Sequence, residues 1–147
     1  NDGLTLTAAA GVYNMSGQQL YTNWIGGIKA VYTTERMNYT VAVSRAVPPS
    51  SSGGFRKTDS LDLGWLFDIS ERDQAGVAYG LSKSKKDSEI ALDFLDYQQI
   101  GAFYNHTLSS HWQSNFYVNH QEIHLPTGRA RNDVIGLSLV FDAISFK

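Results

Sequence analysis

Residues 60–69 read SLDLGWLFDI and alternate, with few exceptions, between large apolar side chains and small or polar ones. Successive side chains of a β-strand point to opposite faces, so one face of this segment carries Leu61, Leu63, Trp65, Phe67 and Ile69. The other face carries Ser60, Asp62, Gly64, Leu66 and Asp68. One face suits hydrocarbon and the other suits a polar interior, which is the pattern of a strand in a transmembrane β-barrel.

The same period of two recurs along most of the chain, whereas helical periodicity is weak throughout. Strands are predicted over residues 4–14, 20–34, 37–47, 59–69, 74–83, 94–108, 112–123 and 133–146. A chain of 147 residues is long enough for one domain with this number of membrane strands. The sequence therefore predicts an all-β fold, in which residues 1–147 form a single antiparallel up-and-down transmembrane β-barrel of about eight strands.

The connections between the predicted strands alternate in length. Tight turns are predicted at residues 35–36, 70–73 and 109–111, and longer links at 16–19, 48–58, 84–93 and 124–132. This asymmetry is typical of outer-membrane barrels, whose short turns are periplasmic and whose longer loops are extracellular. An even number of strands would place both termini in the periplasm.

The placement of charge distinguishes a membrane barrel from a soluble one. Central positions of the apolar phase carry no Asp, Glu or Lys, and a Lys or Arg at mid-bilayer on a lipid face costs about 2–4 kcal/mol. The opposite phase carries amides and charges, so we expect an interior hydrogen-bonded network in which Lys29 offsets some of the carboxylates. The residues expected in this network are Lys29, Asp62, Asp68, Asn105, Asn115, Asn119 and Asp142.

Aromatic residues support the same placement. Those on the apolar phase near the predicted short turns or the chain end are Tyr32, Tyr39, Phe67, Trp112 and Phe141. They predict a girdle at one membrane interface. The alternative is a β-sandwich with these side chains in its core, although a sandwich should expose more charge on its outer faces.

The last predicted strand includes residues 134–146, which read VIGLSLVFDAISF. In strand number, loop asymmetry and this closing strand, the chain resembles the small bacterial outer-membrane barrels of the OmpA and OmpX type. The resemblance implies a Gram-negative envelope protein whose final strand is recognised by the barrel-assembly machinery. Ile144 and Phe146 fall out of phase with Leu139, and Lys147 follows them. Either a bulge precedes them or the chain is a piece of a larger barrel.

Composition excludes several classes of function. The formal net charge of -2 and the lack of a basic or RNA-binding motif argue against nucleic acid as a partner. With no cysteine, the chain has no disulfide, no thiolate catalysis and no cysteine-ligated zinc. No segment is apolar enough for a membrane helix and no signal peptide opens the sequence, so we expect a mature form.

Two groups of residues are candidates for chemistry. His120, Glu122 and His124 would share one face of a strand, but the two histidines lie about 13 Å apart at ~3.3 Å per residue, which favours a solvated rim over a metal site. Lipid A deacylase barrels use a His and a Ser two positions apart. Here His111 and Ser114 are three positions apart and no acid is evident, so we expect no acyl hydrolase.

Basic residues are concentrated at the long-loop end of the predicted barrel. They are Arg45, Arg56, Lys57, Lys83, Lys85, Lys86, Arg129 and Arg131. This basic rim either pairs with phosphates of lipopolysaccharide or is a solvated loop surface, since acidic residues share it.

The sequence thus predicts a non-enzymatic integral outer-membrane protein without a cofactor, embedded in membrane lipids. Its loops would contact lipopolysaccharide, surface ligands or an envelope protein partner. Side chains should fill its interior, because eight strands enclose little space. The alternatives are a narrow, porin-like channel or part of a larger export barrel, and a lipid-modifying outer-membrane enzyme whose activity would depend on His106, His111 or Ser114.

Overall fold

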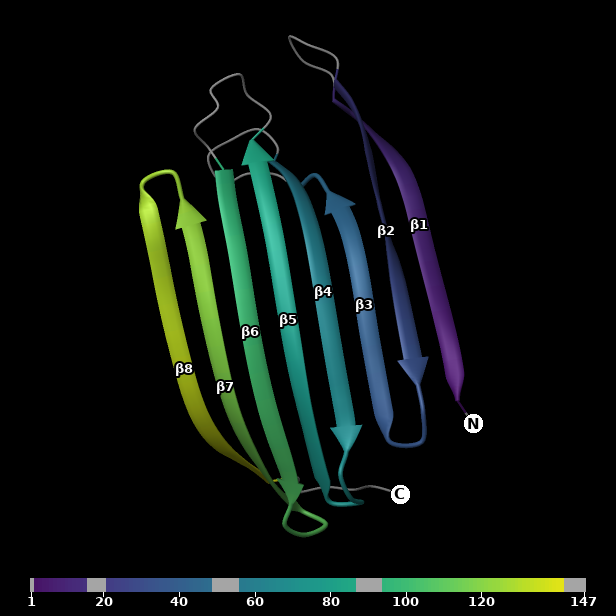
Figure 1. Cartoon of the computed structure of the whole chain (residues 1–147), viewed down its shortest axis with the longest axis vertical. Helices are drawn as coiled ribbons and strands as arrows, with labels where there is room; N and C mark the ends of the chain where they lie inside the picture. Colours follow the sequence, from purple (N-terminus) through teal and green to yellow (C-terminus); the bar gives the residue numbers. More distant parts are fainter. Residues whose placement is uncertain (1, 16–20, 49–55, 87–93, 142–147) are drawn as a thin grey trace.

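The computed structural model describes residues 2–15, 21–48, 56–86 and 94–141. They form eight strands, β1 (Gly3–Met15), β2 (Tyr21–Thr33), β3 (Met37–Ala46), β4 (Arg56–Asp68), β5 (Asp73–Lys86), β6 (Phe94–Thr107), β7 (Trp112–Leu125) and β8 (Gly128–Phe141). Each strand pairs antiparallel with the next in one sheet, without a helix among the described residues (Figure 1). The predicted all-β class, strand number and up-and-down order are confirmed. No described segment is a helix able to cross a membrane.

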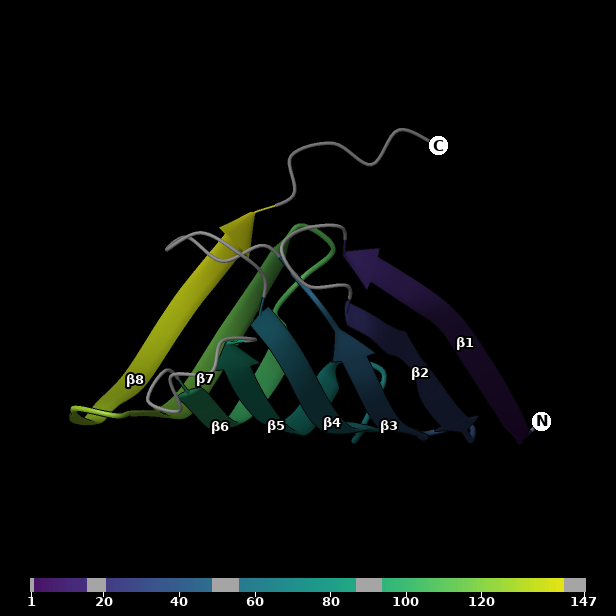
Figure 2. The same cartoon turned by 90° about the horizontal axis from the view of Figure 1, so that it is seen from above.

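The sheet curves into an open trough with β1 and β8 at its two edges (Figure 2). Among the described residues β1 and β8 make no contact with each other. The backbone groups on the outer side of each edge strand therefore have no strand partner in this arrangement. The structure contains the predicted strands but not their closure into a barrel.

The seven strand registers keep the apolar phase of every strand on the same face of the sheet, called the apolar face below. One row of directly opposed residues on this face runs Leu4, Tyr32, Tyr39, Trp65, Val77, Ala102, Val118 and Ile135. The neighbouring row on the opposite, polar face runs Thr5, Val31, Thr40, Gly64, Ala78, Gly101, Asn119 and Val134. The alternation in the sequence thus becomes two chemically distinct surfaces.

The polar face is the crowded side of the trough. The buried residues among those described are Gly76, Gly80 and Ser84, and all three lie on this face. A Cβ atom at Gly76 would lie 2.5 Å from Cε1 of the Phe103 ring and 3.1 Å from the Trp65 carbonyl oxygen. Crowding on the polar face and exposure on the apolar face identify the polar face as the concave side.

The connection between β7 and β8 differs from the prediction. A long link was expected over residues 124–132, but β7 continues to Leu125, β8 begins at Gly128, and Leu125 pairs with Gly128. The two strands are therefore joined by a two-residue turn at Pro126 and Thr127 (Figure 1). Polar and charged cross-strand pairs extend this hairpin where the apolar alternation ends, so apolar periodicity alone underestimated its length. The links at 16–19, 48–58 and 84–93 lie largely outside the described residues.

We predict that Gly76→Ala destabilises the sheet by about 1–3 kcal/mol, because the added methyl group must displace the Phe103 ring. Gly64→Ala is the matched control, since its Cβ would meet only Thr40 Cβ, at 3.6 Å. The control should be neutral or slightly stabilising because alanine restricts the unfolded chain. Urea unfolding in detergent measures both variants, and equal midpoints would contradict the proposed ring contact.

Candidate functional site

A row of polar side chains crosses the polar face near the short turns. Gln74 Nε2 donates to Asp68 Oδ1 at 2.8 Å, and Asn105 Nδ2 donates to Gln74 Oε1 at 3.5 Å. Asn115 Nδ2 donates in turn to Asn105 Oδ1. These four residues are directly opposed in β4 to β7, so one hydrogen-bonded chain links four strands. The structure brings together Asp68, Asn105 and Asn115 of the residues expected in the interior network.

The other expected members of the network lie apart from this chain. Lys29 and Asp62 share a row on the polar face but Ala42 separates them, and they form no ion pair within 4.0 Å. Asn119 lies beside Gly101, where a Cβ would meet its Oδ1 at 3.3 Å. Asp142 lies outside the described residues.

Aromatic rings line the apolar face near the short turns. Ring centroids of Tyr32 and Tyr39 lie 6.3 Å apart, and those of Tyr39 and Trp65 lie 6.5 Å apart, both pairs nearly parallel. At the other edge of the sheet Trp112 packs on Phe141 with centroids 4.8 Å apart. Each pair is directly opposed in its strand register. This arrangement is a band of aromatic side chains at one end of the apolar face.

At the opposite end of the apolar face, a row of ionisable residues crosses six strands, and the sign of its charge alternates from Arg45 to Asp96. The row consists of Arg45, Asp59, Lys83, Asp96, His124 and Arg129, each directly opposed to the next. Arg45 and Asp59 form a bidentate pair, with Nε to Oδ1 at 2.5 Å and Nη2 to Oδ2 at 2.9 Å. Six members of the predicted basic rim are in register with the residues of the apolar face. They are Arg45, Lys57, Lys83, Lys85, Arg129 and Arg131. Arg56 and Lys86 oppose each other in the other phase.

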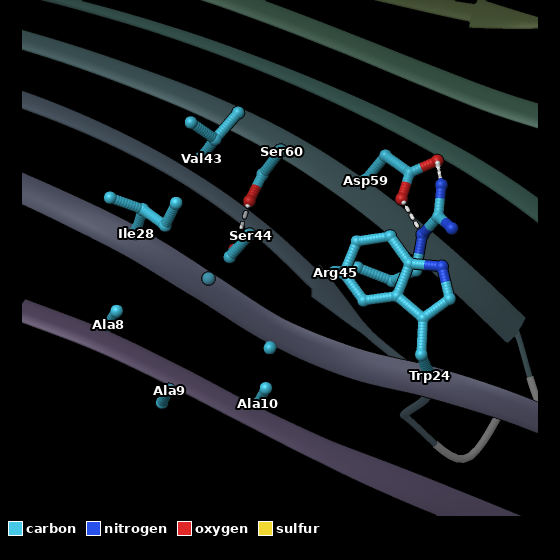
Figure 3. A pocket seen from close by; sticks show the side chains of 12 residues that line it. Ala8, Ala9, Ala10, Trp24, Ile28, Val43, Ser44, Arg45, Asp59 and Ser60 are labelled. Atoms are coloured by element: carbon cyan, nitrogen blue, oxygen red, sulfur yellow. Dashed lines mark hydrogen bonds and ion pairs between the residues drawn. The ribbon is translucent and has the colours of Figure 1, made fainter.

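A hollow of about 630 Å³ lies on the apolar face beside this row (Figure 3). Its lining includes Ala8, Ala10 and Ile28, and its charged end holds Arg45, whose guanidinium carbon lies 4.2 Å from the centroid of the Trp24 ring. Gly26 has φ 151°, and a Cβ there would overlap the carbonyl oxygen of Ala9. The small residues of β1 and β2 leave this space open beside Trp24, and they also let the two strands approach each other closely.

His120, Glu122 and His124 share the apolar face, as their spacing implies, but they do not converge on one point. His120 Nδ1 lies 2.5 Å from Oδ1 of Asp133, whereas His124 Nε2 lies 3.4 Å from Oε1 of Glu122. Among the described residues no group of three or more acidic or histidine side chains could hold a metal ion.

Glu122 is instead the centre of a cationic cluster. Arg129 Nη1 and Arg131 Nε each lie 3.6 Å from its Oε1, the same oxygen that His124 approaches. That oxygen is buried and makes these close contacts without a hydrogen bond of good geometry. The two arginines of the rim are thus neutralised in part by the one carboxylate that lies within 4.0 Å of both among the described residues.

Sequence reasoning missed Asp73, which joins three side chains at the short-turn end. Its carboxylate accepts hydrogen bonds from Ser70 Oγ at 2.5 Å and from Tyr104 Oη at 2.5 Å, and it lies 2.6 Å from His106 Nδ1. His106 is 33 positions away in sequence. Only the register of β5 with β6 could have revealed this contact, because no local motif links the two residues.

Ser114 is directly opposed to His106 in β6–β7, so an acid, an imidazole and a hydroxyl occupy three neighbouring strands. However, Ser114 Oγ donates to the carbonyl oxygen of His106, at 3.3 Å, and not to its ring. His111 contacts the hydroxyl of Ser110, at 2.8 Å. The arrangement lacks the bond that would activate a serine nucleophile, and it fits a role in anchoring the β4–β5 turn to β6.

No family model matches the chain, and no curated protein or solved structure is significantly similar to it. The features of the chain that bear on its function are the two faces of the sheet and the charges at their ends.

We predict that Asp73→Asn lowers the urea midpoint of unfolding, because the neutral amide weakens charge-assisted bonds from Tyr104, His106 and Ser70. Asp133→Asn is the matched control, because this carboxylate also pairs with a histidine but is 75% exposed. The control should stay near the wild-type midpoint. Equal shifts in both variants would show that the additional donors to Asp73 contribute nothing.

Proposed function

We propose that the chain forms the membrane-embedded wall of an outer-membrane β-barrel in a Gram-negative envelope, without enzymatic activity. The observation that carries the proposal is the continuous apolar face. Its side chains are highly exposed, for example Leu6 at 68%, Ile135 at 73% and Leu137 at 72%. Soluble proteins rarely expose apolar patches of this extent, whereas lipid would cover this one.

The lack of a conventional core supports the same proposal. Among the described residues no hydrophobic side chain is buried, and the strands form one sheet with no second layer. A β-sandwich, the soluble alternative, needs two sheets packed face to face. The apolar face therefore needs a partner outside the described strands, and hydrocarbon is the partner that matches its composition.

Strand length and the two ends of the apolar face also fit a bilayer. The strands contain 10 to 14 residues, and a tilted transmembrane strand needs about 9–11. Aromatic rings at one end and the charged row at the other would lie at the two interfaces. In this orientation the β2–β3, β4–β5 and β6–β7 turns face the periplasm, as do the start of β1 and the end of β8. The basic rim and the β7–β8 turn face lipopolysaccharide, surface ligands or an envelope protein partner.

The edges of the sheet must be paired for this function. Unpaired backbone groups in hydrocarbon cost several kcal/mol each, so only closed barrels span membranes as strands. We propose that β1 pairs with β8, with the polar face as a side-chain-filled interior and the closing strand as the signal for the barrel-assembly machinery. The open edges of this structure favour a second candidate, in which the eight strands are a sector of a larger porin-like or export barrel.

The test of membrane insertion is heat-modifiable gel mobility of the detergent-refolded chain, with circular dichroism on the same sample. A β spectrum and different mobilities of boiled and unboiled protein support a closed membrane barrel. Monodisperse behaviour without detergent and a single mobility would overturn the proposal.

We predict that Val41→Lys destabilises the chain folded in phospholipid vesicles by about 2–4 kcal/mol, since Val41 lies on the apolar face. Thr40→Lys is the matched control, one residue away on the polar face. It should insert almost normally. Urea titration in vesicles measures both, and similar losses would contradict a lipid-facing role for Val41.

We predict that β1 and β8 meet in the membrane. The chain has no cysteine, so spin labels on Thr5→Cys and Ser138→Cys report the separation of the edges in one protein. Pulsed electron paramagnetic resonance should give a short distance that excess unlabelled chain leaves unchanged. Loss of the short distance on dilution would indicate closure by a second copy, and a long distance would favour the larger barrel; either contradicts self-closure.

A further inference from the structure

Three lysines differ from the other described members of the basic rim. Arg45 is paired with Asp59, and Arg129 and Arg131 approach Glu122. By contrast, the lysines of β4 and β5 on the apolar face have no carboxylate within the 4.0 Å of an ion pair among the described residues. They are Lys57, Lys83 and Lys85.

The strand register places these lysines together. Lys57 and Lys85 are directly opposed in β4–β5, an arrangement in which like charges destabilise a sheet. Asp59 is opposed to Lys83 in the next row of the same face, but both of its carboxylate oxygens are bound by Arg45. Lys83 is also directly opposed to Asp96 of β6. The surplus positive charge that an added anion would relieve is therefore centred on Lys57 and Lys85.

An apolar surface lies next to the lysines. A hollow of about 380 Å³ is lined by all three lysines, by Asp59 and Ser60, and by Val43, Leu61 and Leu81. These apolar residues are directly opposed in neighbouring strands, on the apolar face, one row nearer its centre than Asp59. The hollow thus joins a cationic rim to a hydrocarbon-like surface, the two environments that a phosphorylated lipid requires.

We propose that this lysine pocket binds lipopolysaccharide, with a phosphate of its lipid A between Lys57, Lys83 and Lys85 and an acyl chain on Val43, Leu61 and Leu81. The proposal rests on the membrane role given above, because only then do the apolar face and its loop end contact the outer leaflet. Charge complementarity selects the ligand, since a phosphate group presents several acceptor oxygens to the three ammonium groups. The predicted rim of eight basic residues is thereby narrowed to three lysines of β4 and β5, in a pocket that β3, β4 and β5 line.

The test uses the full chain refolded into phosphatidylcholine vesicles that contain fluorescently labelled bisphosphorylated lipid A. Energy transfer from the tryptophans reports binding, and unlabelled lipid A, its dephosphorylated form and phosphatidylglycerol serve as competitors. Heat-modifiable mobility of each sample reports insertion separately. Lys57→Gln combined with Lys85→Gln is compared with Arg129→Gln combined with Arg131→Gln, which removes the same charge from the same rim.

We expect the double lysine variant to insert normally and to lose about tenfold or more in affinity for lipid A. The double arginine variant should stay within about twofold of wild type, because Glu122 already neutralises part of its charge. Equal losses would show diffuse attraction, and equal competition by dephosphorylated lipid A or phosphatidylglycerol would show no selection for lipid A phosphate; each result overturns the pocket alone. Failure of the wild-type chain to insert would overturn the membrane role first.

Discussion

The in-phase pairing of eight strands is the constraint on which the rest of the structure depends. Side chains alternate with a period of two, so a slip of one residue in any register would move every apolar side chain of that strand to the polar face. All seven registers avoid this slip. Backbone hydrogen bonds alone would tolerate several registers. Only one of these registers places all the apolar side chains on one face and the polar side chains on the other, so that register is favoured.

The same registers place chemistry at the ends of the sheet. Asp68, Gln74 and Asn105 become neighbours because they occupy one row, although the sequence separates them by a turn and a strand. The rim forms in the same way, since Asp59 can bind Arg45 only when β3 and β4 are correctly aligned. Each cross-strand pair contributes modestly, but the pairs at both ends favour the same registers as the apolar face between them.

The sequence predicted the strands well and the contacts between them poorly. Alternation at residues such as Leu61 and Leu63 is local, so it can be recognised without a partner strand. The β7–β8 turn was missed because polar residues replace apolar ones around Glu122, so the apolar periodicity that predicts a strand is absent there. The contact of Asp73 with His106 depends on register over 33 positions, which a single sequence does not encode locally. Closure of the sheet would depend likewise on edge strands that are far apart in the chain.

The open trough and its exposed apolar face have a common physical explanation. A sheet without a second layer cannot bury side chains such as Leu137 or Ile135 against itself, so its apolar face needs an external apolar phase. That phase would in turn penalise the unpaired edges of β1 and β8, since hydrocarbon offers them no hydrogen-bond partner. Water imposes the opposite balance, because it solvates the edges and leaves the apolar face unfavourably exposed. A membrane would therefore both cover the face and drive the edges to pair, and closure would then be a consequence of insertion and not a property of the isolated strands.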